Sequence, residues 1–94
     1  MSLSDPFLDA IVTRLYRSAE LLPDPGFREL LKNAALALLR AEDFDGLQRT
    51  LTLADSLLVT AGALGFMPEA MVTSLRDPLP LVLEPRELAR TAAH

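Results

Sequence analysis

Apolar residues recur at helical spacing from the start of the chain. Leu8, Ile11, Leu15, Ala19 and Leu22 follow one another at steps of three and four residues. This spacing is typical of one face of a helix. A small oxygen-bearing residue before a proline is a common helix start, because its side chain caps free N–H groups and proline fits the first turn. The sequence therefore predicts a helix that opens at Ser4-Asp5-Pro6 and ends before Pro23-Asp24-Pro25-Gly26.

The same periodicity predicts a second helix over about 26–42 and a third over about 45–63. Their inner faces hold Phe27, Leu31, Ala34, Leu38 and Ala41, then Leu47, Leu51, Ala54, Leu58 and Ala61. An acidic turn, residues 42–46, separates the two helices. Nothing from Leu57 to Met67 is charged, and a helix that is apolar all round is buried on all sides. We therefore expect the third helix to be central or to lie at a subunit interface.

Glycine and proline residues interrupt the helical pattern in the C-terminal part of the chain. Gly65 is placed to end the third helix, and Pro68 can begin a fourth that continues to Arg76. Beyond it, alternate positions between Pro78 and Pro85 are Leu, and prolines bias their neighbours towards extended conformations. We expect an extended Pro/Leu segment over 78–85 that carries Leu79, Leu81 and Leu83, with room for a short fifth helix over 85–92.

These elements predict an all-α fold, a small bundle of four main helices in a single domain spanning residues 1–94. Its core should include Leu15, Leu31, Leu38, Leu51, Leu58 and Ala61. Half of the 94 residues are hydrophobic, and most of these are Leu and Ala, which favour helices. A chain this short buries only about 60–65% of the surface its unfolded form exposes. Some apolar surface should therefore remain exposed, and such surface often marks an interface.

Charge and composition argue against several classes of binding partner and site. The formal net charge is −4, no two basic residues are adjacent, and Lys32 is the only lysine. Nucleic-acid binders and membrane-surface helices need a concentrated basic face. The start of the sequence lacks a signal-peptide pattern, and no apolar run reaches the ~20 residues that span a bilayer. We expect a cytoplasmic protein without a membrane or nucleic-acid partner. The chain has no Cys, so disulfides and thiolate metal sites are excluded.

Candidate chemistry is sparse. Asp43-x-Asp45-Gly46 resembles the middle of a calcium loop, but the positions of the first and last ligands hold Ala41 and Thr52. A capped turn between helices is the better interpretation. The only His is residue 94, so no Ser or Thr has an evident base. Asp55 should lie on a narrow solvated stripe; the alternative is burial and pairing with Arg14, Arg17 or Arg49. We predict no catalytic, cofactor or metal site.

One stretch resembles a known family. Ala37, Asp43-Phe44-Asp45, Leu47, Leu51 and Ala54 are similar to the inter-helix turn of a tetratricopeptide unit, over about a third of the chain (residues 31–64). Glu42 replaces the family's small residue before the turn. No second copy follows at the ~34-residue period, and such units need stacked neighbours. We interpret the stretch as a generic helical hairpin; membership of the family would imply peptide or protein binding.

The leading functional hypothesis is a non-enzymatic protein–protein association module: a small adaptor, an assembly or secretion chaperone, or a subunit of a larger complex. Self-association as a homodimer is the simplest way to cover surplus apolar surface. The predicted interaction residues are Leu36, Leu57, Leu64, Phe66, Met67, Leu79, Leu81 and Leu83. One alternative is a nucleic-acid-associated regulator with a helix-turn-helix-like core. The other is a small enzyme whose carboxylate site forms between two chains.

Overall fold

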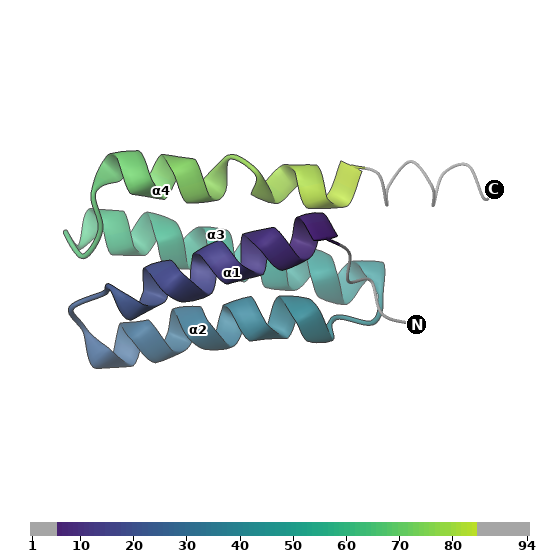
Figure 1. Ribbon diagram of the computed structural model, residues 1–94, viewed down its shortest axis with the longest axis horizontal. Helices are drawn as coiled ribbons and strands as arrows, with labels where there is room; N and C mark the ends of the chain where they lie inside the picture. Colours follow the sequence, from purple (N-terminus) through teal and green to yellow (C-terminus); the bar gives the residue numbers. More distant parts are fainter. Residues whose placement is uncertain (1–5, 85–94) are drawn as a thin grey trace.

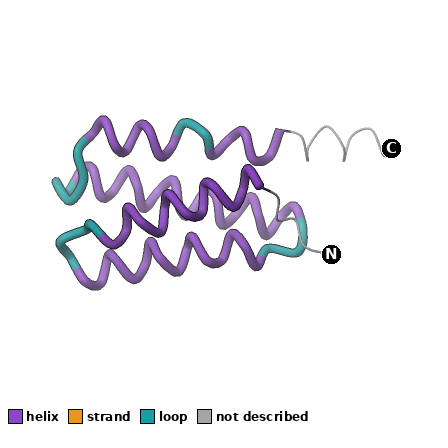
Figure 2. Tube along the Cα trace, viewed as in Figure 1, coloured by secondary structure: helices purple, strands orange, loops and turns teal. Residues whose placement is uncertain are grey.

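The computed structural model describes residues 6–84, which form an all-α bundle (Figure 1). The helices are α1 (Pro6–Glu20), α2 (Pro25–Arg40), α3 (Phe44–Ala63) and α4 (Glu69–Arg76). A further helical stretch covers 79–84, and no strand occurs within the described range. Each helix runs antiparallel to the one before it, so the α1–α2 and α3–α4 connections lie at one end of the bundle (Figure 2). The predicted fold class and the four main helices are confirmed.

Local signals set the helix ends. The Asp24 side chain accepts a hydrogen bond from the backbone N–H of Phe27 at 2.7 Å, and Pro25 occupies the first turn of α2. The Asp43 carboxylate accepts from the N–H of Gly46 at 2.6 Å at the start of α3. These bonds satisfy N–H groups that have no partner inside the helix. The acidic turn is thus a capped helix junction, as predicted.

The helices pack in a ring around one core. α1 and α3 each pack against both α2 and α4. The face formed by α1 and α4 is therefore opposite the face formed by α2 and α3. All six predicted core residues are buried, and the largest fully enclosed side chains are Leu8, Leu15, Leu22, Leu31, Leu38, Leu47, Leu58 and Val82. Burial of each such Leu contributes about 1.5–3 kcal/mol relative to exposure, so this apolar core is the main source of stability.

The connection between α3 and α4 depends on glycine. Gly65 has φ 77°, and its N–H donates to Gly62 O at 3.1 Å, while the N–H of Phe66 donates to Ala61 O at 2.9 Å. This pair of bonds is a Schellman motif, which ends a helix through a left-handed residue. It turns the chain so that α4 can return along α3. The predicted C-terminal cap is confirmed.

The predicted extended segment over 78–85 is wrong for the residues described. Residues 79–84 are helical, and Leu79 and Val82, three residues apart, are buried, whereas Leu81 is 47% exposed. Pro80 is tolerated because it lies in the first turn, where its missing N–H removes no helical hydrogen bond. The predicted fifth helix over 85–92 lies outside the described residues.

The expectation that α3 is enclosed on all sides is also wrong for the single chain. Val59 is 44% exposed and Leu64 is 58% exposed. In a ring of four helices, each helix buries one face in the shared core and leaves its outer face open. The other option, an interface between α3 and another chain, stays a prediction.

Candidate association surfaces

An uncharged row, apolar except for one threonine, follows the outer side of α3 as far as its C-cap residue. Leu53, Leu57, Thr60 and Leu64, here named the α3 stripe, are spaced four, three and four residues apart. This is the spacing of the seam in a coiled coil. Leu53 is 51% exposed and Leu64 is 58% exposed, while Leu57 is half-buried against the core. The Thr60 hydroxyl donates to Ser56 O at 2.8 Å, so it needs no outside acceptor.

The α3 stripe lies on the α2 side of α3. The α3 residues that line the grooves beside α4 and the 79–84 stretch include Gln48, Asp55, Val59 and Gly62, and none of them belongs to the stripe. The stripe therefore lies on the opposite side of the buried face of α3, the side towards α2. On neighbouring α2, Leu30 is also exposed.

The predicted interaction residues divide by burial. Leu64 and Leu81 are exposed, and Leu36, Leu57, Phe66 and Leu83 are half-buried. Phe66 packs edge-to-face on Phe27, with ring centroids 5.6 Å apart. Met67 and Leu79 are buried within the single chain. We therefore remove these two from the set, because their side chains already pack in the core and have almost no surface for a partner.

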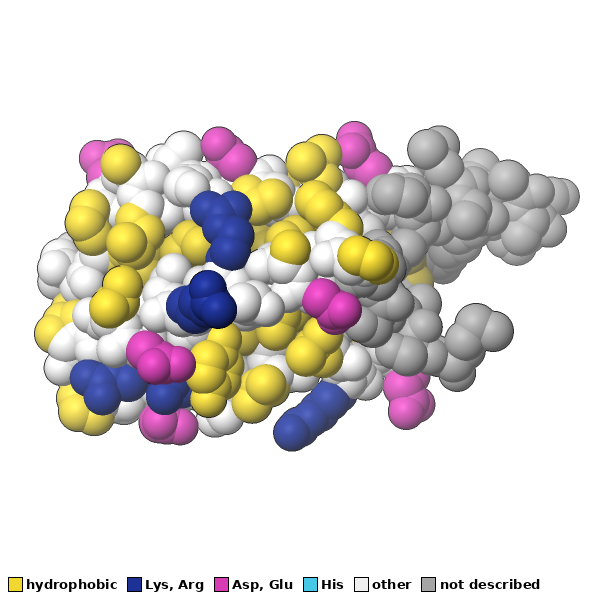
Figure 3. Space-filling model, viewed as in Figure 1, with side chains coloured by type: hydrophobic (Ala, Val, Ile, Leu, Met, Phe, Trp, Pro, Cys, Tyr) yellow, Lys and Arg dark blue, Asp and Glu magenta, His cyan; other side chains and the backbone are white. Residues whose placement is uncertain are grey.

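A basic groove runs between α1 and α4. It has a volume of about 470 Å³ and is lined by Arg14, Arg17, Ser18, Ala70, Met71, Ser74 and Leu75; it is here named the α1–α4 groove. The Arg14 guanidinium donates to Ser74 Oγ at 2.7 Å, which links the two helices. Figure 3, in the same view as Figure 1, shows basic side chains over α1 with apolar ones on either side. The sequence pattern offered both arginines only as partners for Asp55, because helical periodicity does not place α4 beside α1.

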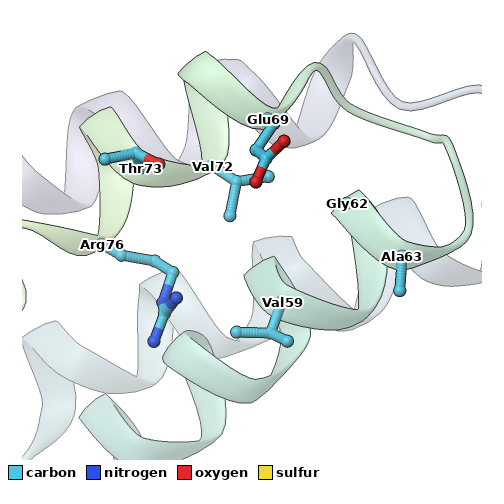
Figure 4. Close-up of a pocket in the computed structure, with 7 residues that line it drawn as sticks. All are labelled: Val59, Gly62, Ala63, Glu69, Val72, Thr73 and Arg76. Atoms are coloured by element: carbon cyan, nitrogen blue, oxygen red, sulfur yellow. The ribbon is translucent and has the colours of Figure 1, made fainter.

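A second groove lies between α3 and α4 (Figure 4). It has a volume of about 340 Å³ and is lined by Val59, Gly62, Ala63, Glu69, Val72, Thr73 and Arg76. The backbones approach closely here: a Cβ on Gly62 would lie 3.0 Å from Val72 Cγ2. Glu69, Thr73 and Arg76 are three or four residues apart on α4, so one side of this groove is polar.

An ion pair joins Arg76 of that groove to Asp55 on α3. Arg76 Nε lies 2.7 Å from Asp55 Oδ1, and a second bond of 3.3 Å joins Nη2 to Oδ2. The hydrogen bond that the Arg76 guanidinium donates to Asp55, reinforced by the negative charge of Asp55, raises the pKa of Arg76. Asp55 is half-exposed, in keeping with the predicted solvated stripe. The alternative partners considered for it, Arg14, Arg17 and Arg49, are wrong, since the true partner lies on α4.

Within residues 6–84, no group of three or more His, Asp or Glu side chains is placed to hold a metal ion. None of the described helices is both long and apolar enough to cross a bilayer. Comparison with protein-family models, curated proteins and solved structures finds no match for this chain. The surfaces of the chain itself are therefore the basis for a functional proposal.

Proposed function

We propose that this protein is a non-enzymatic association module that binds a second copy of itself through the α3 stripe. The observation that supports this most strongly is the uncharged seam of Leu53, Leu57, Thr60 and Leu64, left open on the outer side of a packed bundle. Two copies related by a two-fold axis bring the same row of each α3 together, antiparallel. The result is a dimer with one continuous apolar layer between two bundles.

The energetics favour such a contact. Fully burying an exposed Leu contributes about 1.5–3 kcal/mol, and Leu53 and Leu64 are each more than half exposed. The stripe contains no charged group, so pairing it incurs no cost for removing ions from water. Four Leu contacts, two from each copy, act together against the entropy lost on association.

The test is the oligomeric state of the full chain by sedimentation equilibrium. We expect the wild type to form a dimer whose population rises with concentration. A double variant, Leu53→Asp with Leu64→Asp, should be monomeric, because pairing would bury four carboxylates without partners. Its far-ultraviolet circular dichroism should match that of the wild type, since both side chains are on the surface.

The matched control is Val59→Asp, which places the same carboxylate on the same helix but outside the stripe. It should remain a dimer. A wild type that stays monomeric up to its solubility limit contradicts the proposal. So does a double variant that dimerises as strongly as the wild type.

A further inference from the structure

The α1–α4 groove lies on the face of the bundle opposite the α3 stripe. α1 and α4 pack against each other, whereas the stripe lies on the α2 side of α3. Self-association through the stripe therefore leaves this groove open. A ligand held there does not compete for the same surface.

The charge of the groove is opposite to that of the chain. Two arginines line it and no Asp or Glu does, although the net charge of the protein is −4. Glu20 ends α1 and Asp77 is the C-cap residue of α4, but neither lines the groove. Arg14 is held by Ser74, and Arg17 makes no hydrogen bond or ion pair with any residue that the structure describes. The groove therefore offers one fixed and one free guanidinium to an anionic group.

Apart from its two arginines and from Ser18 and Ser74, the groove is lined by apolar residues, and it continues to the end of the bundle. Met71, Leu75 and Ala70 form its apolar wall. Ser18 and Met71 also line a small hollow of about 70 Å³ beside Leu21 and Phe66, so the two depressions are contiguous. Leu21 is 73% exposed there. The surface thus combines an apolar trough with a basic side.

We propose that the α1–α4 groove binds an acidic amphipathic helix of a partner protein. A trough between two antiparallel helices accepts the apolar face of a third helix. In this arrangement, apolar side chains of the partner contact Leu21, Ala70 and Met71, which are exposed or half-buried, and its carboxylates pair with Arg14 and Arg17. Guanidinium groups suit this role because they bind carboxylates through two parallel hydrogen bonds.

A second copy is a poorer occupant of this groove. A two-fold contact through the same face brings one basic surface against another, and like charges across an interface oppose binding. The arginines are also too few to follow a nucleic-acid backbone, which requires several phosphate contacts. Charge complementarity therefore favours a foreign acidic segment.

The test uses two synthetic helical peptides with the same heptad of Leu residues, one with Glu at its polar positions and one with Lys. Fluorescence anisotropy of the labelled peptides measures binding to the full chain. We expect the Leu/Glu peptide to bind, with an affinity that falls as salt is added, and the Leu/Lys peptide to bind at least about tenfold more weakly. Amide chemical-shift changes should map to α1 and α4.

The decisive variant is Arg14→Glu with Arg17→Glu, which should reduce affinity for the Leu/Glu peptide by about tenfold or more. Arg40→Glu with Arg49→Glu makes the same change in net charge at exposed sites elsewhere and should leave the affinity nearly unchanged. Equal losses for both variants would overturn the proposal, because the effect would then be one of overall charge. Equal binding of the two peptides, shifts confined to other helices, or no binding of the Leu/Glu peptide would also overturn it.

Discussion

At the scale of single residues, Gly62 in the last turn of α3 and Gly65 just after that helix are needed for different physical reasons. Gly65 has φ 77°, and nothing lies within 4 Å of where its Cβ would be. A residue with a side chain is disfavoured there only by the left-handed backbone conformation. Gly62 lies inside α3, where the constraint is space: a Cβ would lie 3.0 Å from Val72 Cγ2. The same substitution at each position therefore separates backbone strain from packing.

Gly65→Ala should lower the free energy of unfolding by about 1–2 kcal/mol, through the left-handed conformation that Ala resists. A second change, Val72→Ala, should not relieve this loss. Gly62→Ala gains up to about 1 kcal/mol of helix propensity but must displace Val72, so its effect should become more favourable when Val72 is also Ala. Urea unfolding of the complete double-mutant cycles measures both couplings. If the coupling energies of Val72 with the two glycines were equal, the distinction between backbone strain at Gly65 and packing at Gly62 would be wrong.

For Asp55, the sequence predicts the exposure of the side chain but not the partner with which it forms an ion pair. The solvated position of Asp55 follows from helical periodicity, but its partner is 21 residues away on another helix. Only tertiary packing brings the two groups together. Because the pKa of Arg76 is raised, its contribution to stability is fully present below the ordinary arginine pKa and is lost as the pH rises from there through the raised value. The guanidinium therefore adds no pH dependence to stability near neutrality.

At the scale of helices, what sequence predicts depends on whether the signal is local. Asp24, Pro25 and Asp43 mark the starts of α2 and α3 because capping involves only neighbouring residues. The 79–84 stretch has no such decisive signal. Its Leu residues fit a two-residue period through Leu81, while Leu79 and Val82 fit a helical one. Burial against the bundle selects the helix, and that information is not local.

If residues 79–84 are helical, Leu79 and Leu81 should contribute differently to stability, whereas in an extended segment they should contribute similarly. Leu79→Ala should lower the free energy of unfolding by about 2–5 kcal/mol, because it leaves a cavity in the core. Leu81→Ala should change it by no more than about 0.5 kcal/mol, because that side chain is already 47% exposed and is not part of the core. Midpoints of urea unfolding measure both. In an extended segment the two Leu residues share one face, so similar losses would argue against the helix.

At the scale of the whole molecule, packing of the bundle leaves some Leu residues in the core and others on the surface. A surplus of Leu is evident from composition, and so is the expectation that some of it stays exposed. Which Leu residues remain outside depends on how the helices rotate about their axes in the ring. Leu21 and Leu53 were not among the predicted interaction residues, yet both are exposed, whereas the predicted Met67 is in the core. Burial in one chain thus redefines the candidate interface.

The two proposed surfaces lie on opposite faces of the bundle, so their functions should be separable. Arg14→Glu with Arg17→Glu should still dimerise, and Leu53→Asp with Leu64→Asp should still bind the Leu/Glu peptide with nearly wild-type affinity, because distant sites without shared contacts act independently. Native mass spectrometry of the wild type with the peptide should show two chains carrying two peptides. If the monomeric variant loses the peptide, the groove depends on the dimer, and the single bundle is not the binding unit.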